Sequence, residues 1–283
     1  MSSKLESSME PRGGESLFTK EMGGGPRTLV FIAGLGGTTR YWEARIGPLC
    51  RSYRIVLVDL LGFGESPKPW TKYDVERHVG ALEGAISDLG QVTIIGHSLG
   101  ALVATAYAAR HPERIDGIVL ISLPYFGSED AAYEYMRHGP VKGGFVYTNL
   151  FLTMLACIIS RRLVGKILPY FIRDMPREVV EDLVKHTWRS STSSLWEVVY
   201  RYDAAVDLQV LVPTTKLLLI HGDGDLMAPV KSVQYLAARF PNLELRILDG
   251  VDHHPFIRDP EMCQDLIARF VERTSRSVIA KQS

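Results

Sequence analysis

The chain has 283 residues, enough for one large domain or for a domain that carries an insertion. Its 32 Lys and Arg residues balance 32 Asp and Glu residues, so no overall field favours nucleic acid or an anionic membrane. The 46% hydrophobic content supports a sizeable core, while the three cysteines are too scattered for a disulfide framework or a cysteine-based metal site.

The two ends of the chain are polar. Residues 1–14 are rich in Ser, Gly and Glu and contain no apolar run, so we expect no secretory signal. Together with scattered cysteines that suit a reducing compartment, this favours a cytoplasmic location. We expect an N-terminal tail over 1–26, with an antiparallel edge strand near 18–21, and a C-terminal tail over 274–283.

Between these ends, short apolar runs alternate with helical patterns. Strands are expected at 29–32, 54–58, 92–95, 117–121, 216–220 and 244–248, and helices at 41–50, 75–89, 101–110, 230–240 and 261–273. This alternation predicts crossover units and therefore an α/β fold, in which a mostly parallel sheet carries helices on both faces. The core is assigned to residues 27–123 and 214–273.

The alternation stops over residues 124–213, which contain no convincing strand and several helical patterns rich in aromatic residues, Leu, Ile and Met. We expect a helical lid over the strand ends, where ligands bind in open α/β sheets. Its most apolar run is LFLTMLACII at 150–159, shorter than the roughly 20 residues that span a bilayer. We interpret this run as a lid helix that packs on the core and lines the pocket; a face that contacts lipid or an acyl chain is the less favoured alternative.

The sequence GHSLG at 96–100 stands between an expected strand and an Ala-rich expected helix. A serine at such a corner sits on a strained turn with its hydroxyl held above the sheet, and flanking glycines let the backbone pass closely. This pattern predicts that Ser98 is a nucleophile. The alternative is a glycine-rich turn in which Ser98 merely caps the helix.

A catalytic serine requires an acid and then a histidine, each after a later strand. Both are present: HGDGDLMAP follows the strand at 216–220 and contains Asp225, and DGVDHHP follows the strand at 244–248 and contains His253. A neighbouring imidazole activates a serine hydroxyl by accepting its proton, and a carboxylate orients that imidazole. Asp223 is the alternative acid, although it suits the tight turn around it, and His254 is the alternative base.

With these pieces in place, residues 28–273 resemble the lidded α/β-hydrolase family. Four further motifs match: DLLGFGES at 59–66, HPER at 111–114, a G-x-x-D-x-x-x-P spacing through Gly222, Asp225 and Pro229, and an H-x-P spacing through His253, Pro255 and Pro260. The resemblance implies Ser98 as nucleophile, His253 as general base and Asp225 as the orienting acid. It also implies an oxyanion hole made by the backbone N–H groups of Leu35 and Leu99.

The chain departs from the family pattern at two positions. Ala33 stands where a histidine often precedes the oxyanion loop, and Asp252 replaces the usual glycine before the catalytic histidine. The backbone donor at Leu35 survives the first change. The sequence offers no account of the second.

We therefore expect a serine hydrolase that cleaves a carboxylic ester or related acyl bond of a largely apolar small molecule, with no cofactor, no metal and no nucleic-acid partner. The leading enzymatic alternative is a hydrolase of C–C bonds next to a carbonyl, which a basic residue near the pocket would support; candidates are Arg161, Arg162, Arg173 and Arg189. A dehalogenase or epoxide hydrolase is disfavoured because those relatives carry Asp at the nucleophile position. The third possibility is a ligand-binding receptor without turnover. The oligomeric state is left open.

Overall fold

The computed structural model describes residues 16–164 and 168–282, which contain a seven-stranded sheet in the order β1-β3-β2-β4-β5-β6-β7. The strands are β1 (Thr19–Gly23), β2 (Thr28–Ile32), β3 (Arg54–Val58), β4 (Val92–His97), β5 (Ile115–Ile121), β6 (Leu217–Gly222) and β7 (Leu243–Leu248). β1 is antiparallel to β3 and every other pairing is parallel. The expected α/β class and the edge strand near 18–21 are confirmed.

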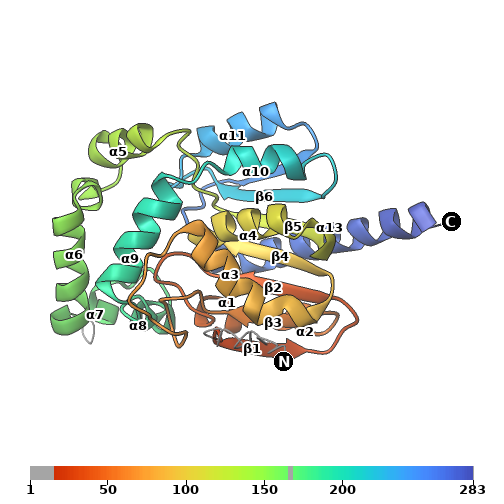
Figure 1. The fold of residues 1–283 in the computed structure, drawn as a ribbon, viewed down its shortest axis with the longest axis horizontal. Helices are drawn as coiled ribbons and strands as arrows, with labels where there is room; N and C mark the ends of the chain where they lie inside the picture. The colour runs from red at the N-terminus through yellow and green to blue at the C-terminus, as the bar shows by residue number, and fades with distance from the viewer. Residues whose placement is uncertain (1–15, 165–167, 283) are drawn as a thin grey trace, which may run out of the picture.

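Side chains alternate along the strands, so the sheet buries two separate cores. One face packs Val30, Ile94 and Leu219 against helices α3 (Val75–Ile86), α4 (Leu99–Arg110), α10 (Ala204–Leu211) and α11 (Val230–Arg239). The other face packs Phe31, Ile95 and Leu218 against helices α1 (Arg40–Glu43), α2 (Gly47–Cys50), α12 (Pro255–Arg258) and α13 (Pro260–Gln282). Helices therefore cover both faces of the sheet (Figure 1).

Three helices differ in extent from the prediction. The helix expected at 41–50 is two short helices, Arg40–Glu43 and Gly47–Cys50, and Pro48 lies in the first turn of the second, where proline is favoured. The helix expected at 75–89 ends at Ile86 and continues as the 3₁₀ turn η1 (Ser87–Leu89). The last helix, expected to end at Arg273, runs to Gln282, since no Gly or Pro follows Pro260 to stop it.

Between β5 and β6 the chain forms only helices within the residues that the structure describes, as expected. They are α5 (Glu129–His138), η3 (Gly144–Thr148), α6 (Leu150–Ile159), η4 (Ser160–Val164), α7 (Leu168–Phe171), α8 (Arg177–Asp182), α9 (Trp188–Ser194), η5 (Leu195–Tyr200) and α10. Helix α10 packs on α4 and belongs to the sheet's core. Helices α5 to α9, which we call the insertion, lie together at one end of the sheet (Figure 1).

Candidate active site

Ser98 occupies the corner between β4 and α4 with φ 52° and ψ −117°, a conformation that is rare for a residue with a side chain. The two glycines allow the corner to be tight. A Cβ on Gly96 would lie 2.3 Å from the carbonyl oxygen of Gly100, and one on Gly100 would lie 2.4 Å from that of Ile32. Ser98 is the N-cap residue of α4, but its hydroxyl makes no capping hydrogen bond to the helix.

His253 lies between Ser98 and Asp225. Its Nδ1 is 2.8 Å from Asp225 Oδ2, and its Nε2 is 3.0 Å from Ser98 Oγ. Asp225 comes from the loop after β6 and His253 from the loop after β7, so parallel strand ends bring together side chains that are far apart in sequence. The structure thus brings the three expected residues into one hydrogen-bonded chain.

The Asp225 carboxylate is buried and fully engaged. Its Oδ1 accepts hydrogen bonds from the backbone N–H groups of Met227 and Ala228, both at 2.8 Å. Burial raises the pKa of this carboxyl, but the hydrogen bond and charge of His253 outweigh burial, and the net pKa lies below its ordinary value. An ionised carboxylate only accepts hydrogen bonds, so His253 carries its proton on Nδ1 and presents a free Nε2 lone pair to the Ser98 hydroxyl.

The alternative acid, Asp223, and the alternative base, His254, make their contacts outside the chain of hydrogen bonds to Ser98. Asp223 accepts a hydrogen bond from the N–H of Gly250 (2.7 Å) and so braces the two strand-end loops. His254 lies 3.5 Å from the Tyr41 hydroxyl, and burial, followed by the charge of His253, lowers its pKa to about 4. Among the described residues, His253 is the side chain that hydrogen-bonds to Ser98 Oγ.

His97, which the sequence analysis did not assign a role, supports the His253 loop. Its Nε2–H donates to the carbonyl oxygen of His253 (2.8 Å), and its ring stacks on Tyr41 with centroids 4.8 Å apart. Burial, followed by the charges of His253 and His254, lowers the pKa of His97 well below its ordinary value. A neutral donor in a fixed orientation therefore holds the backbone that carries His253. Its place beside Ser98 at the end of β4 is the sequence signal that marks it.

Asp252, unexplained by the sequence, lies between the histidine loop and Arg258. Its Oδ1 accepts from the N–H of His254 (2.9 Å) and its Oδ2 accepts from Arg258 Nε (2.9 Å). The same guanidinium donates to the carbonyl oxygen of Asp174 in the insertion. Burial raises the pKa of Asp252, but the hydrogen bond from Arg258 outweighs it, and the net pKa is lowered. Asp252 thus links the histidine loop to the insertion through one arginine.

The expected oxyanion donors lie on either side of Ser98. Leu35 follows β2 and, with Ser98, lines the cavity described below, and Leu99 is the first residue of α4. Neither backbone N–H donates a hydrogen bond to another group of the described chain. The loop that carries Leu35 is closed by the Gly37 N–H on the Gly34 carbonyl (2.9 Å), while Ala33 is buried in the core beneath it. The loop is therefore held by backbone contacts, without the histidine common in the family.

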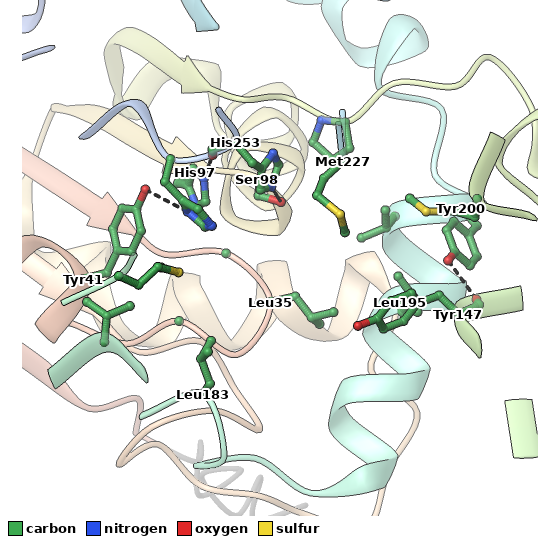
Figure 2. Close-up of a pocket in the computed structure, with 18 residues that line it drawn as sticks. Leu35, Tyr41, His97, Ser98, Tyr147, Leu183, Leu195, Tyr200, Met227 and His253 are labelled. Atoms are coloured by element: carbon green, nitrogen blue, oxygen red, sulfur yellow. Dashed lines mark hydrogen bonds between the residues drawn. The ribbon is translucent and has the colours of Figure 1, made fainter. Parts of the chain in front are cut away.

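A cavity of about 370 Å³ opens beside Ser98 and His253. Figure 2 shows these two side chains at one side of it and Leu195, Tyr200 and Tyr147 at another. Most of its wall is apolar, and the insertion and η5 supply eight of the eighteen lining residues: Met136, Tyr147, Met175, Val179, Leu183, Leu195, Val199 and Tyr200. The part of the wall formed by described residues contains no Lys or Arg, so none of the four lid arginines named above lines it.

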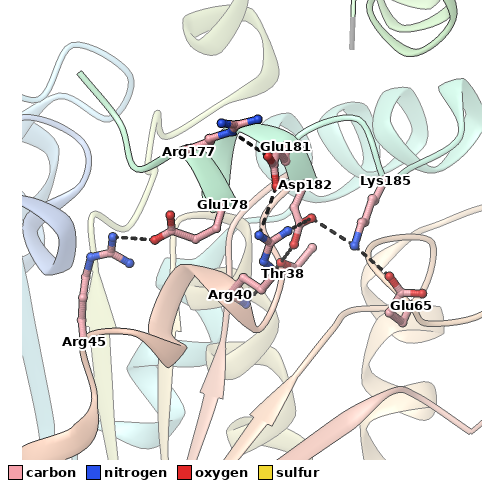
Figure 3. Close-up of polar contacts among 9 residues, drawn as sticks. All are labelled: Thr38, Arg40, Arg45, Glu65, Arg177, Glu178, Glu181, Asp182 and Lys185. Atoms are coloured by element: carbon pink, nitrogen blue, oxygen red, sulfur yellow. Dashed lines mark hydrogen bonds and ion pairs between the residues drawn. The ribbon is translucent and has the colours of Figure 1, made fainter. Parts of the chain in front are cut away.

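A polar cluster joins the insertion to the loop after β2 (Figure 3). At its centre is the buried carboxylate of Asp182, at the end of α8. It accepts hydrogen bonds from Thr38 Oγ1 (2.6 Å) and Arg40 (2.8 Å), and it pairs with Lys185 (3.0 Å). The cluster fixes α8, whose Val179 side chain lines the cavity.

The described residues lack the features of two other classes of site. No group of three His, Cys, Asp or Glu side chains is arranged to hold a metal ion. No helix is both long enough and apolar enough to cross a membrane.

A family model described as alpha/beta hydrolase fold matches residues 27–260. The chain belongs to the α/β-hydrolase fold family. The match covers most of the chain, from the first parallel strand to the start of α13, so the expected family and the expectation of a hydrolase are confirmed.

Relatives of this α/β hydrolase include proteins with and without a described activity. It is 28% identical over 267 residues to the uncharacterized protein Rv2715 of Mycobacterium tuberculosis, covering 89% of this chain and 77% of the relative. It is also 28% identical over 252 residues to the probable lysophospholipase BODYGUARD 4 of Arabidopsis thaliana, where the match covers 81% of this chain and 60% of the plant protein.

Solved structures with the same fold include a bromoperoxidase from Bacillus anthracis and the esterase EaEST from Exiguobacterium antarcticum. The TM-scores are 0.74 and 0.73, the sequence identities are 20% and 19%, and each match covers 90% of this chain and 95% of the other. At such identities the likeness establishes the fold alone.

Proposed function

We propose that the protein is a serine hydrolase that cleaves a carboxylic ester, or a related acyl bond, of a largely apolar small molecule. The observation that carries this proposal is the position of His253, within hydrogen-bond distance of both Ser98 Oγ and Asp225 Oδ2. This is the arrangement in which a base activates a nucleophile and a carboxylate orients the base.

The reaction would proceed through an acyl-enzyme. Ser98 Oγ attacks the carbonyl carbon while its proton passes to His253 Nε2, and the Asp225 carboxylate stabilises the resulting imidazolium. The carbonyl oxygen becomes an oxyanion that accepts hydrogen bonds from the N–H groups of Leu35 and Leu99. His253 then gives its proton to the leaving alcohol. A water molecule, deprotonated by the same imidazole, releases the acyl group from Ser98.

The insertion, in this proposal, is a lid that selects the substrate. Together with η5, it supplies eight aliphatic or aromatic side chains to the cavity wall, which suits an apolar acyl or alcohol group. The described residues of the wall offer no cation for a carboxylate. One relative is a probable lysophospholipase, and esterases are among the solved structures with this fold. Both activities are consistent with an acyl ester as substrate. The C–C hydrolase alternative lacks the basic wall residue that would favour it.

The test is hydrolysis of p-nitrophenyl esters of increasing chain length, together with labelling by a fluorophosphonate probe. The wild-type protein should be labelled and active, and Ser98→Ala should abolish labelling and lower kcat/KM by about a thousandfold or more. If the wild-type protein is neither labelled nor active towards any ester, while Ser98→Ala binds an apolar ligand as tightly as wild type, the receptor alternative holds instead.

A matched pair of variants tests the acid. Asp225→Asn should lower kcat/KM by about a hundredfold or more, because the amide can donate to Nδ1 and so favours the wrong imidazole tautomer. Asp223→Asn, two residues away in the same loop, should cost less than about tenfold because its partner is a backbone N–H outside the triad. Equal losses in two well-folded variants would contradict the assignment.

A further inference from the structure

Helix α6 has its apolar and polar residues in the reverse of the usual places. Its sequence, LFLTMLACII, is the most apolar helix of the insertion, yet its single buried residue is Thr153. The Thr153 hydroxyl lies 2.6 Å from the carbonyl oxygen of Val146 in η3 and 3.0 Å from that of Asn149 one turn earlier, so its one hydrogen is shared between two backbone acceptors. An apolar helix in a globular protein normally turns its large side chains to the core. Here four of them, Leu150, Phe151, Leu155 and Ile159, are exposed. No residue of α6 is among those that line the cavity, so the expected lid helix that packs on the core and lines the pocket is wrong.

Three of the exposed side chains, Phe151, Leu155 and Ile159, follow at four-residue intervals and therefore lie along one side of α6. We define the α6 face as Phe145, Leu150, Phe151, Leu155 and Ile159. Phe151 is 64% exposed and Leu150 is 56% exposed, values expected of polar surface residues. The helix lies on the outer side of α9, at the edge of the molecule away from the sheet (Figure 1). Contiguous exposed apolar residues of this kind indicate a binding surface.

The stretch of sequence that contains this face carries charges of one sign only. Residues 137–173 contain six Lys and Arg residues and no Asp or Glu, in a chain whose total charge is zero. Arg137, Lys142, Arg161 and Arg162 from this stretch are exposed, and none of the four forms an ion pair with a carboxylate of the described residues. By contrast, the arginines and lysine beside α8 are paired with carboxylates. Cations left unpaired beside an apolar surface predict an anionic partner.

We propose that the α6 face docks on the surface of an anionic lipid bilayer. The large side chains of α6 enter the boundary between headgroups and acyl chains, and the four exposed cations contact the lipid phosphates. With 10 residues, α6 lies in the plane of this interface and does not cross it. A second copy of the chain fits less well, because a twofold contact would place these cations against themselves.

The face adjoins the cavity beside Ser98. Tyr147 lies in η3, between Phe145 and Leu150 in sequence, and its side chain forms part of the cavity wall. The Tyr200 hydroxyl, also in the wall, donates to the Tyr147 carbonyl oxygen (2.9 Å). A docked molecule would therefore hold its cavity next to the bilayer, whether or not the proposed hydrolysis is correct.

Vesicle flotation with the full-length protein tests the docking. Wild-type protein should float with vesicles made of equal parts phosphatidylcholine and phosphatidylglycerol, and less with phosphatidylcholine alone or at high salt. Phe151→Ser with Leu155→Ser should weaken binding at least about tenfold through lost apolar insertion. Arg161→Gln with Arg162→Gln should weaken binding to the anionic vesicles by about tenfold or more.

The matched control is Val206→Ser with Val210→Ser on α10. These valines are 60% and 63% exposed, as apolar and as accessible as the α6 side chains, but lie outside the basic stretch. The control should bind like wild type, and circular dichroism and thermal unfolding should be unchanged in every variant. Three outcomes overturn the proposal: wild-type protein that stays in solution with both vesicles, equal losses in the α6 and α10 variants, or a stable dimer that the α6 substitutions dissociate.

Discussion

Helices α6 and α9 pack side by side in the insertion, and their compositions contradict their positions (Figure 1). The apolar α6 is exposed, whereas α9, with the sequence WRSSTSS, buries Ser190, Ser191, Thr192 and Ser194. Helix α9 tolerates burial because its hydroxyls are satisfied. Ser190 Oγ donates to the Gly62 carbonyl oxygen (2.8 Å), and Ser194 Oγ lies 2.9 Å from His78 Nε2. Hydropathy alone does not decide which helix of a pair is covered; the available partners do.

If polar contacts hold the insertion on the sheet domain, removing the carboxylate of Asp182 at the centre of the polar cluster should have the largest effect on stability. Asp182→Ala leaves Thr38, Arg40 and Lys185 without their shared acceptor, and we expect a loss of about 3 kcal/mol in the free energy of unfolding. Chemical denaturation measures this. Glu181→Ala, the exposed neighbour that also pairs with Arg40, is the control and should have a much smaller effect.

The buried imidazole beneath α9 should make the inner side sensitive to acid. Burial lowers the pKa of His78 from 6.5 to about 4. Below pH 6.5 the unfolded chain binds a proton at this ring that the folded chain does not bind until about pH 4, so acid favours unfolding. Between pH 7 and 5 we expect His78 to contribute a loss of about 2 kcal/mol.

His78→Gln should therefore flatten the pH dependence of urea denaturation over that window, whatever it does to stability at pH 7. His138→Gln, at an exposed position on α5, is the matched control. Identical pH profiles for the two variants would show that burial of His78 is not what drives the loss.

The comparison of α6 with α9 can be tested directly by replacing one residue of each helix with alanine. Ser190→Ala removes the capping box of α9 and the bond to Gly62, and should cost about 1–2 kcal/mol. Phe151→Ala removes a far larger side chain from α6, but one that is mostly exposed, and should change stability by less than about 0.5 kcal/mol. Thermal unfolding gives both values; the reverse ranking would mean that α6 is the helix the fold depends on.

The sheet and the three residues brought to the site were accessible from sequence, because each follows a strand and parallel strands end at one edge. The exposure of α6 could not be predicted from sequence, because its composition predicts burial. Its surroundings also depend on α9, a packing partner that is itself polar. The role of Asp252 was hidden for a similar reason. Its partner Arg258 is near in sequence, but the second contact of that arginine, Asp174, is 84 residues away.

The guanidinium of Arg258 has a mechanical consequence. It donates to Asp252, which precedes His253 in the chain, and with its other nitrogens it contacts the backbone and carboxylate of Asp174 in the insertion. If the insertion moved outward at Asp174, the contacts of Arg258 would either break or move the His253 loop with them. In the proposed mechanism, a movement of the insertion at Asp174 would therefore also change the position of His253 through the Arg258 side chain.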